Sequence, residues 1–343
     1  MAYYSSLFDA LGLRDWCDSG DTGSPMSMQD LLAMNQNGGQ KAAWWDFPFP
    51  SLDELHRACG AIGRTRDMTN GIEEGFLAIK DDLKTVLDPL TQPLSWLLEG
   101  ALALFGAIPW WVLIPAILLL VWYVSRAVGV TIFVALTLLF LAVIDHFSYA
   151  IDTLSIIFVC ACLSVLFGVP IGIAMSKSDR LQRFMIPILD MLQTLPAFVY
   201  LIPLIFLFSV TEPKLYGLAI ILYAIVPVIR LTDLGIRLVD KEVVEAADAF
   251  GMTWRQKLFE VEIPLAMPNI MAGVNQTIMM ALAMVVIASL VSAPGLGVLV
   301  LRGINNLELG TGLVAGFGIV LLAVVLDRIS KSAVKRSAYV KRQ

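Results

Sequence analysis

One loop of the chain reads Glu245-Ala246-Ala247-Asp248-Ala249-Phe250-Gly251 and, nine residues later, Val261-Glu262-Ile263-Pro264. Long apolar segments flank this loop on both sides, so it connects two segments that are able to cross a membrane. Asp240 can cap a short helix, which Gly251 can then end in the left-handed conformation. The pattern predicts a compact helical loop over residues 240–266, outside the lipid and between two membrane spans.

The second half of this loop carries its own signals. Thr253 and Gln256 have the spacing of a capping box, which starts a second short helix. That helix is expected to stop or kink near Pro264, because proline lacks the amide donor. The first helix has an apolar face of small residues and an acidic edge. The apolar face is formed by Val243, Ala247 and Phe250, and the acidic edge is formed by Glu242, Glu245 and Asp248. A short helix with these two faces could bind in a groove of a partner protein.

Composition places the chain in a membrane. Hydrophobic residues make up 58% of the 343 positions, charged residues only 15%, and the mean hydropathy is +0.77. A helix needs about 20 residues to cross a hydrocarbon layer of about 30 Å. Apolar runs that reach or approach this length lie near 108–125, 127–145, 148–176, 186–208, 215–236, 267–291 and 312–328. The prediction is an all-α polytopic membrane protein with about seven spans.

Charge is divided unevenly along the chain. Residues 1–107 carry 7 Lys and Arg against 15 Asp and Glu, a net −8, whereas residues 108–343 carry 17 against 14, a net +3. Nucleic acid is not expected as a partner, because binding phosphates requires a basic face and the hydrophilic part of this chain is acidic. Basic residues gather at 177–183, at 230–257 and at the C-terminus, which the positive-inside rule places in the cytoplasm. Alternation across seven spans then puts the N-terminus outside.

Four segments are expected on this basis. Residues 1–70 form an acidic, loosely ordered tail. Residues 71–107 form an amphipathic helix that lies along the membrane interface or, alternatively, packs against the protein core. The membrane domain covers residues 108–330 and includes the loop at 240–266, and residues 331–343 form a basic cytoplasmic C-terminus.

The loop resembles the cytoplasmic EAA loop by which the membrane subunits of binding-protein-dependent ABC importers dock onto their ATPases. The resemblance implies that its first helix sits in a cleft of the ATPase and transmits ATP-driven closure to the membrane helices. Carried onto this sequence, the ATPase-coupling residues are Glu245, Ala246, Ala247, Phe250, Gly251 and Pro264. The sequence holds no G-x-x-x-x-G-K-[ST] motif. We therefore expect a transporter subunit that is not itself an enzyme and binds no cofactor, with ATP and Mg²⁺ on the partner ATPase.

Two further stretches narrow the family. LDMLQTLPAFVY at 189–200 and PLAMPNIMAGVNQT at 264–277 look like the permeases of glycine betaine and proline betaine importers, and the resemblance covers roughly residues 90–330. It implies the fold of a type I ABC importer and a homodimer in the bacterial cytoplasmic (inner) membrane. The implied partners are two ATPase copies and a periplasmic or extracytoplasmic substrate-binding protein. The implied solutes are betaines, choline and related osmolytes, including trimethylamine N-oxide.

Polar residues and prolines within the spans are candidates for the translocation pathway, because they must face protein or water rather than lipid. The candidates are Gln193, Thr194, Pro196, Asn275, Gln276 and Thr277. Helix–helix packing is the alternative explanation for them. Gly168, Pro170 and Gly172 in the third predicted span indicate either a gate or close packing with a neighbouring helix.

Rival functions find less support in the sequence. An ion-coupled secondary transporter usually needs a charged residue near mid-membrane, whereas Asp145, Asp152, Asp190 and Asp327 lie near the ends of the predicted spans. No acid–base, thiol–histidine or metal-ligand spacing favours an enzyme. A disulfide between Cys17 and Cys59 is expected only if the N-terminal tail faces an oxidising compartment.

Overall fold

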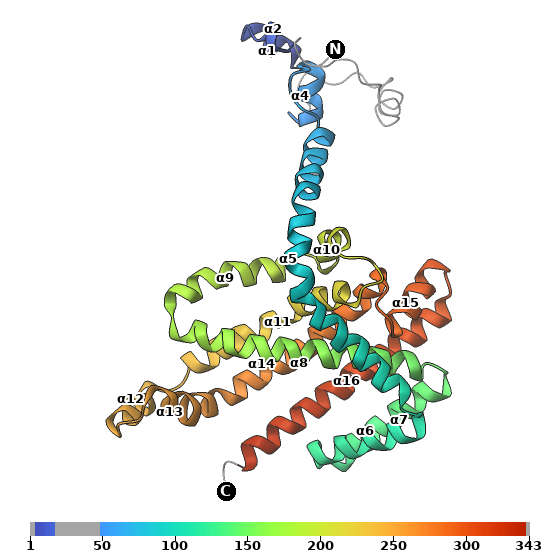
Figure 1. Ribbon diagram of the computed structural model, residues 1–343, viewed down its shortest axis with the longest axis vertical. Coiled ribbons are helices and arrows are strands. Elements are labelled where there is room, and N and C mark those ends of the chain that lie inside the picture. The colour runs from blue at the N-terminus through green and yellow to red at the C-terminus, as the bar shows by residue number, and fades with distance from the viewer. Residues whose placement is uncertain (1–3, 18–48, 341–343) are drawn as a thin grey trace. The chain divides into compact units, whose positions relative to one another are not determined.

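The computed structural model describes residues 4–17 and 49–340 (Figure 1), which contain helices and no β-strand. The first helices are α1 (Ser5–Ala10), α2 (Arg14–Cys17), α4 (Leu52–Ala58), α5 (Thr65–Ala107), α6 (Trp110–Ser125), α7 (Val128–Val143), α8 (Phe147–Lys177) and α9 (Asp179–Thr194). They are followed by η1 (Ala197–Tyr200), α10 (Leu201–Leu207), α11 (Pro213–Arg237), α12 (Lys241–Ala249), α13 (Trp254–Gln256), the π-helix η2 (Lys257–Glu262), α14 (Ile263–Ala288), η3 (Ser289–Val291), α15 (Leu296–Asn305) and α16 (Leu309–Val340).

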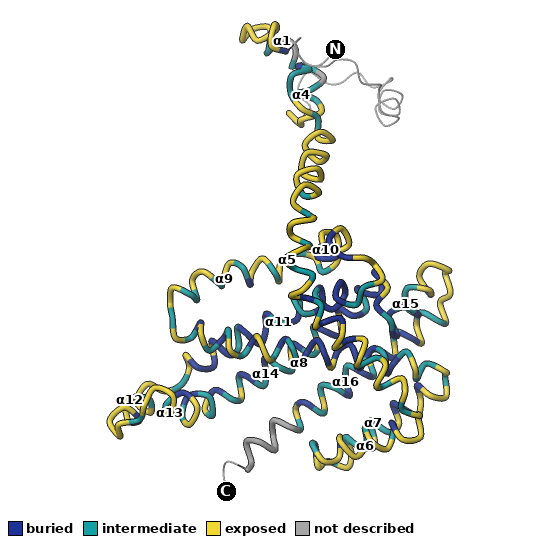
Figure 2. The backbone as a smooth tube through the Cα atoms, in the orientation of Figure 1, coloured by how far each residue is buried: buried dark blue, intermediate teal, exposed yellow. Residues whose placement is uncertain are grey.

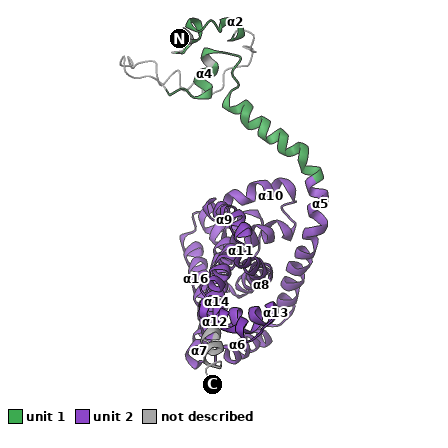
Figure 3. Ribbon diagram, turned by 90° about the vertical axis from the view of Figure 1, so that its left-hand side faces the viewer, with its two compact units in different colours: residues 1–82 green, residues 83–343 purple. Residues whose placement is uncertain are grey.

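The chain divides into two compact units, residues 1–82 and 83–343 (Figure 3). In the first unit a disulfide joins Cys17 at the end of α2 to Cys59, the residue that caps α4. The described part of the predicted loose tail is therefore helical and cross-linked, and residues 18–48 lie outside the described residues. The disulfide closes a long connection between two short helices that could not form a large core by themselves.

The second unit is built around α8, α11 and α14, whose buried residues appear dark blue in Figure 2. Small residues let these helices approach closely. A Cβ atom added at Gly172 of α8 would lie 2.6 Å from the carbonyl oxygen of Ile229 in α11, and one added at Gly273 of α14 would lie 3.0 Å from Cα of Val228. Of the two alternatives for the glycines of the third predicted span, the structure shows close packing.

The structure does not confirm the count of seven spans. Within residues 4–17 and 49–340, four helical stretches are long and apolar enough to cross a membrane, namely α8, α11, the continuous stretch Trp254–Val291 and α16. Two bent pairs raise the number to six if each is one span: α5 with α6, bent by 111°, and α9 with α10, bent by 106°. The predicted span at 127–145 is the 16-residue helix α7, which is short for a full crossing. Prolines lie at both bends, Pro109 and Pro196, and cannot continue a hydrogen-bonded helix.

A buried lysine holds α5 against α11. The Lys214 side chain is only 5% exposed, and its Nζ lies 2.7 Å from Asp88 Oδ1 of α5 and 2.8 Å from Glu212 Oε2. The backbone N–H of Lys214 donates to Ser95 Oγ of α5 at 3.2 Å. A buried ammonium is tolerated because both neighbouring charges are opposite in sign.

We predict that Lys214→Ala lowers the stability of the detergent-solubilised protein by about 2 kcal/mol, because it leaves two carboxylates side by side without a counter-charge. A thermal unfolding curve should shift down by about 6 °C. The matched control is Lys331→Ala, which removes a lysine that is 61% exposed and paired with Asp327, and whose loss should cost less than about 0.5 kcal/mol. Equal shifts in the two variants would contradict the assigned role of Lys214.

Candidate functional site

The predicted loop forms a short helix, α12, at one end of the second unit (Figure 1). Asp240 caps it by accepting a hydrogen bond from the Glu242 N–H at 3.0 Å. Gly251 follows its end with φ of 75°, the left-handed conformation that glycine adopts without strain. These features confirm the local prediction of a capped helix that ends at Gly251.

The second half of the loop differs from the prediction in one respect. The capping box is present, since Thr253 Oγ1 accepts from the Gln256 N–H at 3.4 Å and Gln256 Oε1 accepts from the Thr253 N–H at 3.0 Å. The helix does not stop at Pro264, however, because the π-helix η2 runs directly into α14. Pro264 lies in the first turn of α14, where its missing N–H costs least. The loop is thereby continuous with a membrane helix.

An ion pair fastens the two halves together. Lys257 Nζ of η2 lies 2.7 Å and 2.9 Å from the two carboxylate oxygens of Asp248 in α12. The backbone N–H of Met252 also donates to the carbonyl of Ala247 at 3.2 Å, which closes the turn between them. These contacts join α12 to η2, which continues directly into α14.

The outer surface of α12 is available to a partner. Ala247 is buried against the loop, whereas Glu245 and Ala246 are exposed. Phe250, which the sequence places on the face of Ala247, is 86% exposed. An exposed aromatic ring beside an acidic edge is typical of a docking surface, because such an apolar side chain gains from burial in a partner's pocket.

The candidate pathway residues lie on two elements. Gln193 and Thr194 are exposed at the end of α9, and Pro196 follows at the bend before η1, which contacts α14. On α14, Gln276 is exposed, Thr277 is fully buried, and Asn275 is half-buried. Asn275 Nδ2 donates to Asp327 Oδ1 of α16 at 3.1 Å, so this residue takes part in helix packing. The pathway role of all six residues stays a prediction.

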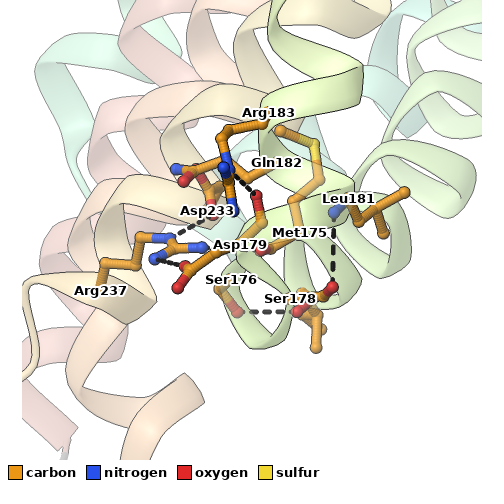
Figure 4. Close-up of polar contacts among 10 residues, drawn as sticks. Met175, Ser176, Ser178, Asp179, Leu181, Gln182, Arg183, Asp233 and Arg237 are labelled. Atoms are coloured by element: carbon orange, nitrogen blue, oxygen red, sulfur yellow. Dashed lines mark hydrogen bonds and ion pairs between the residues drawn. The ribbon is translucent and has the colours of Figure 1, made fainter.

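A group of charged residues at the base of the loop was not predicted as a site (Figure 4). Arg237 donates to Asp233 Oδ1 at 3.0 Å, to Asp179 Oδ1 at 2.8 Å and to the carbonyl of Met175 at 2.9 Å. Gln182 Nε2 donates to the second oxygen of Asp233 at 2.7 Å. In the sequence, the basic residues here served only as topology signals. Acidic residues that alternate with them at the span ends, Asp179 and Asp233, were the available hint.

Comparison with known proteins identifies the class. Residues 164–338 match the family model described as "Binding-protein-dependent transport system inner membrane component". The chain belongs to this family, and it is a multi-pass protein of the inner membrane. The region matched contains α9, α11, the loop with α12, and α14. The exposed residues of α12 therefore lie within the part of the chain that matches the family.

Particular relatives are transport permeases for small methylated solutes. The chain is 39% identical over 285 residues to the glycine betaine/proline betaine transport system permease protein ProW of Escherichia coli, covering 83% of this chain and 78% of ProW. It is 39% identical to the glycine betaine transport system permease protein OpuAB of Bacillus subtilis, covering 71% and 86%. The trimethylamine N-oxide transport system permease protein TmoV of Ruegeria pomeroyi is 38% identical, and the match covers 81% of this chain and 43% of that longer protein.

The fold is also found in a solved transporter. The structure of the MetNI methionine ABC transporter in an inward-facing conformation matches with a TM-score of 0.50 at 17% identity, covering 54% of this chain and 93% of that chain. At this identity the likeness concerns the fold alone. It confirms the predicted transmembrane fold of a type I ABC importer.

Proposed function

We propose that this chain is the permease subunit through which an ATP-driven importer moves betaine-like solutes across the inner membrane. The observation that carries the proposal is the rigid helix α12, which presents Glu245 and Phe250 outside a membrane domain of the matching family. The solutes in the names of these relatives share a methylated nitrogen that is cationic or part of a dipolar group. This supports glycine betaine, proline betaine, choline or trimethylamine N-oxide as solutes.

The proposed complex contains two copies of this chain, two ATPase subunits that bind ATP and Mg²⁺, and one substrate-binding protein on the outer side. Each copy of the chain has one α12, so a homodimer offers one docking helix to each ATPase. Gln193 and Gln276 are exposed on a single copy, which supports their facing a water-filled pathway shared by two copies, since exposed amides are costly in lipid.

The test is uptake of labelled glycine betaine, choline and trimethylamine N-oxide into proteoliposomes. The proteoliposomes contain this chain with its ATPase. The binding protein is added on the side from which solute is taken up, and ATP and Mg²⁺ are supplied on the side that carries the ATPase. Uptake that requires ATP supports the proposal and ranks the solutes. Uptake that proceeds without ATP and collapses with an ion gradient would instead establish the ion-coupled secondary transporter.

We further propose that the N-terminal unit lies on the outer side and that the C-terminus is cytoplasmic. The Cys17–Cys59 disulfide supports this orientation, because such bonds persist in oxidising compartments and are rare in the cytosol. The basic residues at 177–183, at 230–257 and at the C-terminus agree with a cytoplasmic C-terminus through the positive-inside rule.

Thiol labelling should reveal the sidedness of Cys17 and Cys59. In a variant whose other two cysteines are replaced, Cys160→Ser with Cys162→Ser, we expect no reaction of intact spheroplasts with a membrane-impermeant maleimide. Both tail thiols should react after treatment with a membrane-impermeant reductant, because the bond is then broken from outside. Thiols that stay unreactive in intact spheroplasts after the reductant, and react only in inside-out vesicles, would place the unit in the cytoplasm. Reaction of intact spheroplasts without reductant would contradict the disulfide.

A further inference from the structure

Both ends of the loop that carries α12 are fastened to the same turn of the membrane domain. At its beginning, Arg237 ends α11 three residues before the cap Asp240. Its guanidinium reaches across to the carbonyl of Met175 in α8 at 2.9 Å and to Asp179, the first residue of α9, at 2.8 Å (Figure 4). The planar fork of arginine can serve these acceptors at once, which an ammonium group cannot do with fixed geometry.

At the end of the loop a second attachment reaches the same place. Glu262 is the last residue of η2 and is 4% exposed. It forms an ion pair with Lys177, the last residue of α8. The two attachments therefore meet at residues 175–179, the turn between α8 and α9. Leaving the buried carboxylate of Glu262 without Lys177 is strongly unfavourable, so this contact resists separation.

The helix that follows this turn leads to the candidate pathway. α9 begins at Asp179, which is held by Arg237, and ends at Thr194 just before the bend at Pro196. Gln182 in its first turn is tied to Asp233 of α11 at 2.7 Å. α9 continues for 16 residues from Asp179, so a tilt imposed at residue 179 would displace its far end, where Gln193 and Thr194 are exposed.

We infer that residues 175–179, at the junction of α8 and α9, transmit the movement of α12 to these two helices. Arg237, Lys177 and Glu262 are the positioning residues that make the loop, the end of α8 and the start of α9 move as one body. This inference rests on the proposed function, because it assigns the route by which ATPase closure reaches the pathway. None of the three residues needs to touch the solute or the ATPase.

The test measures how much ATP is hydrolysed for each solute imported by the complete complex in proteoliposomes. A merely structural role would lower assembly, hydrolysis and import together, and would leave this ratio unchanged. For Glu262→Gln and for Arg237→Lys we expect normal co-purification with the ATPase and continued hydrolysis, but a ratio raised about tenfold. The exchange Lys177→Glu with Glu262→Lys restores an opposite-charge pair and should return the ratio to within about threefold of the unmodified complex.

Arg230→Gln is the matched control. Arg230 pairs with Asp190, which also joins α11 to α9, but this pair lies away from the ends of the loop and both side chains are more than a third exposed. Its loss should change the ratio by less than about threefold. A ratio that rises equally in Arg230→Gln, or that stays unchanged in Glu262→Gln and Arg237→Lys, would overturn the inference.

The remaining outcomes are also decisive. If Glu262→Gln does not assemble, Arg237→Lys decides: a raised ratio in its assembled complex supports the inference, and an unchanged ratio overturns it. If the unmodified complex imports nothing with ATP, the proposed function itself has failed. If the unmodified complex imports normally, and Glu262→Gln and Arg237→Lys have the same ratio of hydrolysis to import as Arg230→Gln, the proposed function stands. The inference alone is then wrong.

Discussion

Glu245→Arg should abolish ATP-dependent import, because it reverses the charge at the centre of the surface that α12 presents. Glu245 is exposed and lies on a helix whose cap and turn are intact without it. The substitution should therefore leave the fold unchanged. An arginine at this position would oppose whatever positive or polar groups the ATPase places against the acidic edge. Reversing a charge in a docked interface costs several kcal/mol, so we expect ATPase binding to weaken by about 100-fold or more.

The measurement pairs two readouts on the same preparation. Co-purification reports whether the ATPase still binds, and uptake of labelled solute into proteoliposomes reports import, which should fall to the level seen without ATP. Glu260→Arg is the control, because Glu260 is also exposed and belongs to the same loop but lies on η2, outside α12. Import that survives Glu245→Arg, or that is lost equally in Glu260→Arg, would refute the assignment of α12 as the ATPase contact.

Local chemistry explains which parts of this loop were predictable. Asp240 and Gly251 are read from the sequence because a cap and a left-handed terminator act on their own neighbours. The capping box of Thr253 and Gln256 spans only three residues. The π-helix η2 was missed, since no local signal announces the extra residue per turn. Of the two expectations for Pro264, a stop or a kink, the stop was wrong, because proline begins helices as well as breaking them.

Long-range contacts explain what could not be predicted. Arg237 reads as a topology signal, yet its partners Met175 and Asp179 lie 62 and 58 residues away in the chain. Only the packing of α8 and α9 against α11 brings them together. The predicted number of seven spans was not confirmed for a related reason. Apolar runs show where lipid is tolerated, but the bends before Pro109 and Pro196 decide whether a run is one straight crossing.

The glycines of α8 show the same limit, since their spacing fits a flexible helix and a tightly packed one equally well. In the structure the packing is explicit. A Cβ atom at Gly172 would meet the Ile229 carbonyl oxygen at 2.6 Å and Cβ of Thr232 at 2.7 Å. Both atoms belong to α11 and neither is the end of a flexible side chain. The sites that fasten α11 to α8, including Arg237, therefore depend on a helix spacing that only glycine permits at this position.

Gly172→Leu should consequently prevent accumulation of folded protein. The added side chain must push α8 and α11 apart along their buried interface, and such overpacking costs about 3 kcal/mol or more where backbone atoms are in the way. A loss of that size is a large share of the stability of a typical protein. Size-exclusion chromatography of the detergent extract should show no monodisperse peak, and Gly172→Ala should give a reduced one. Gly129→Leu is the control, because Gly129 is exposed on α7 and its added Cβ would meet nothing within 4 Å. A monodisperse Gly172→Leu protein that still imports solute would show that α8 and α11 do not need their close contact, and a gate at Gly172 would then be the better explanation.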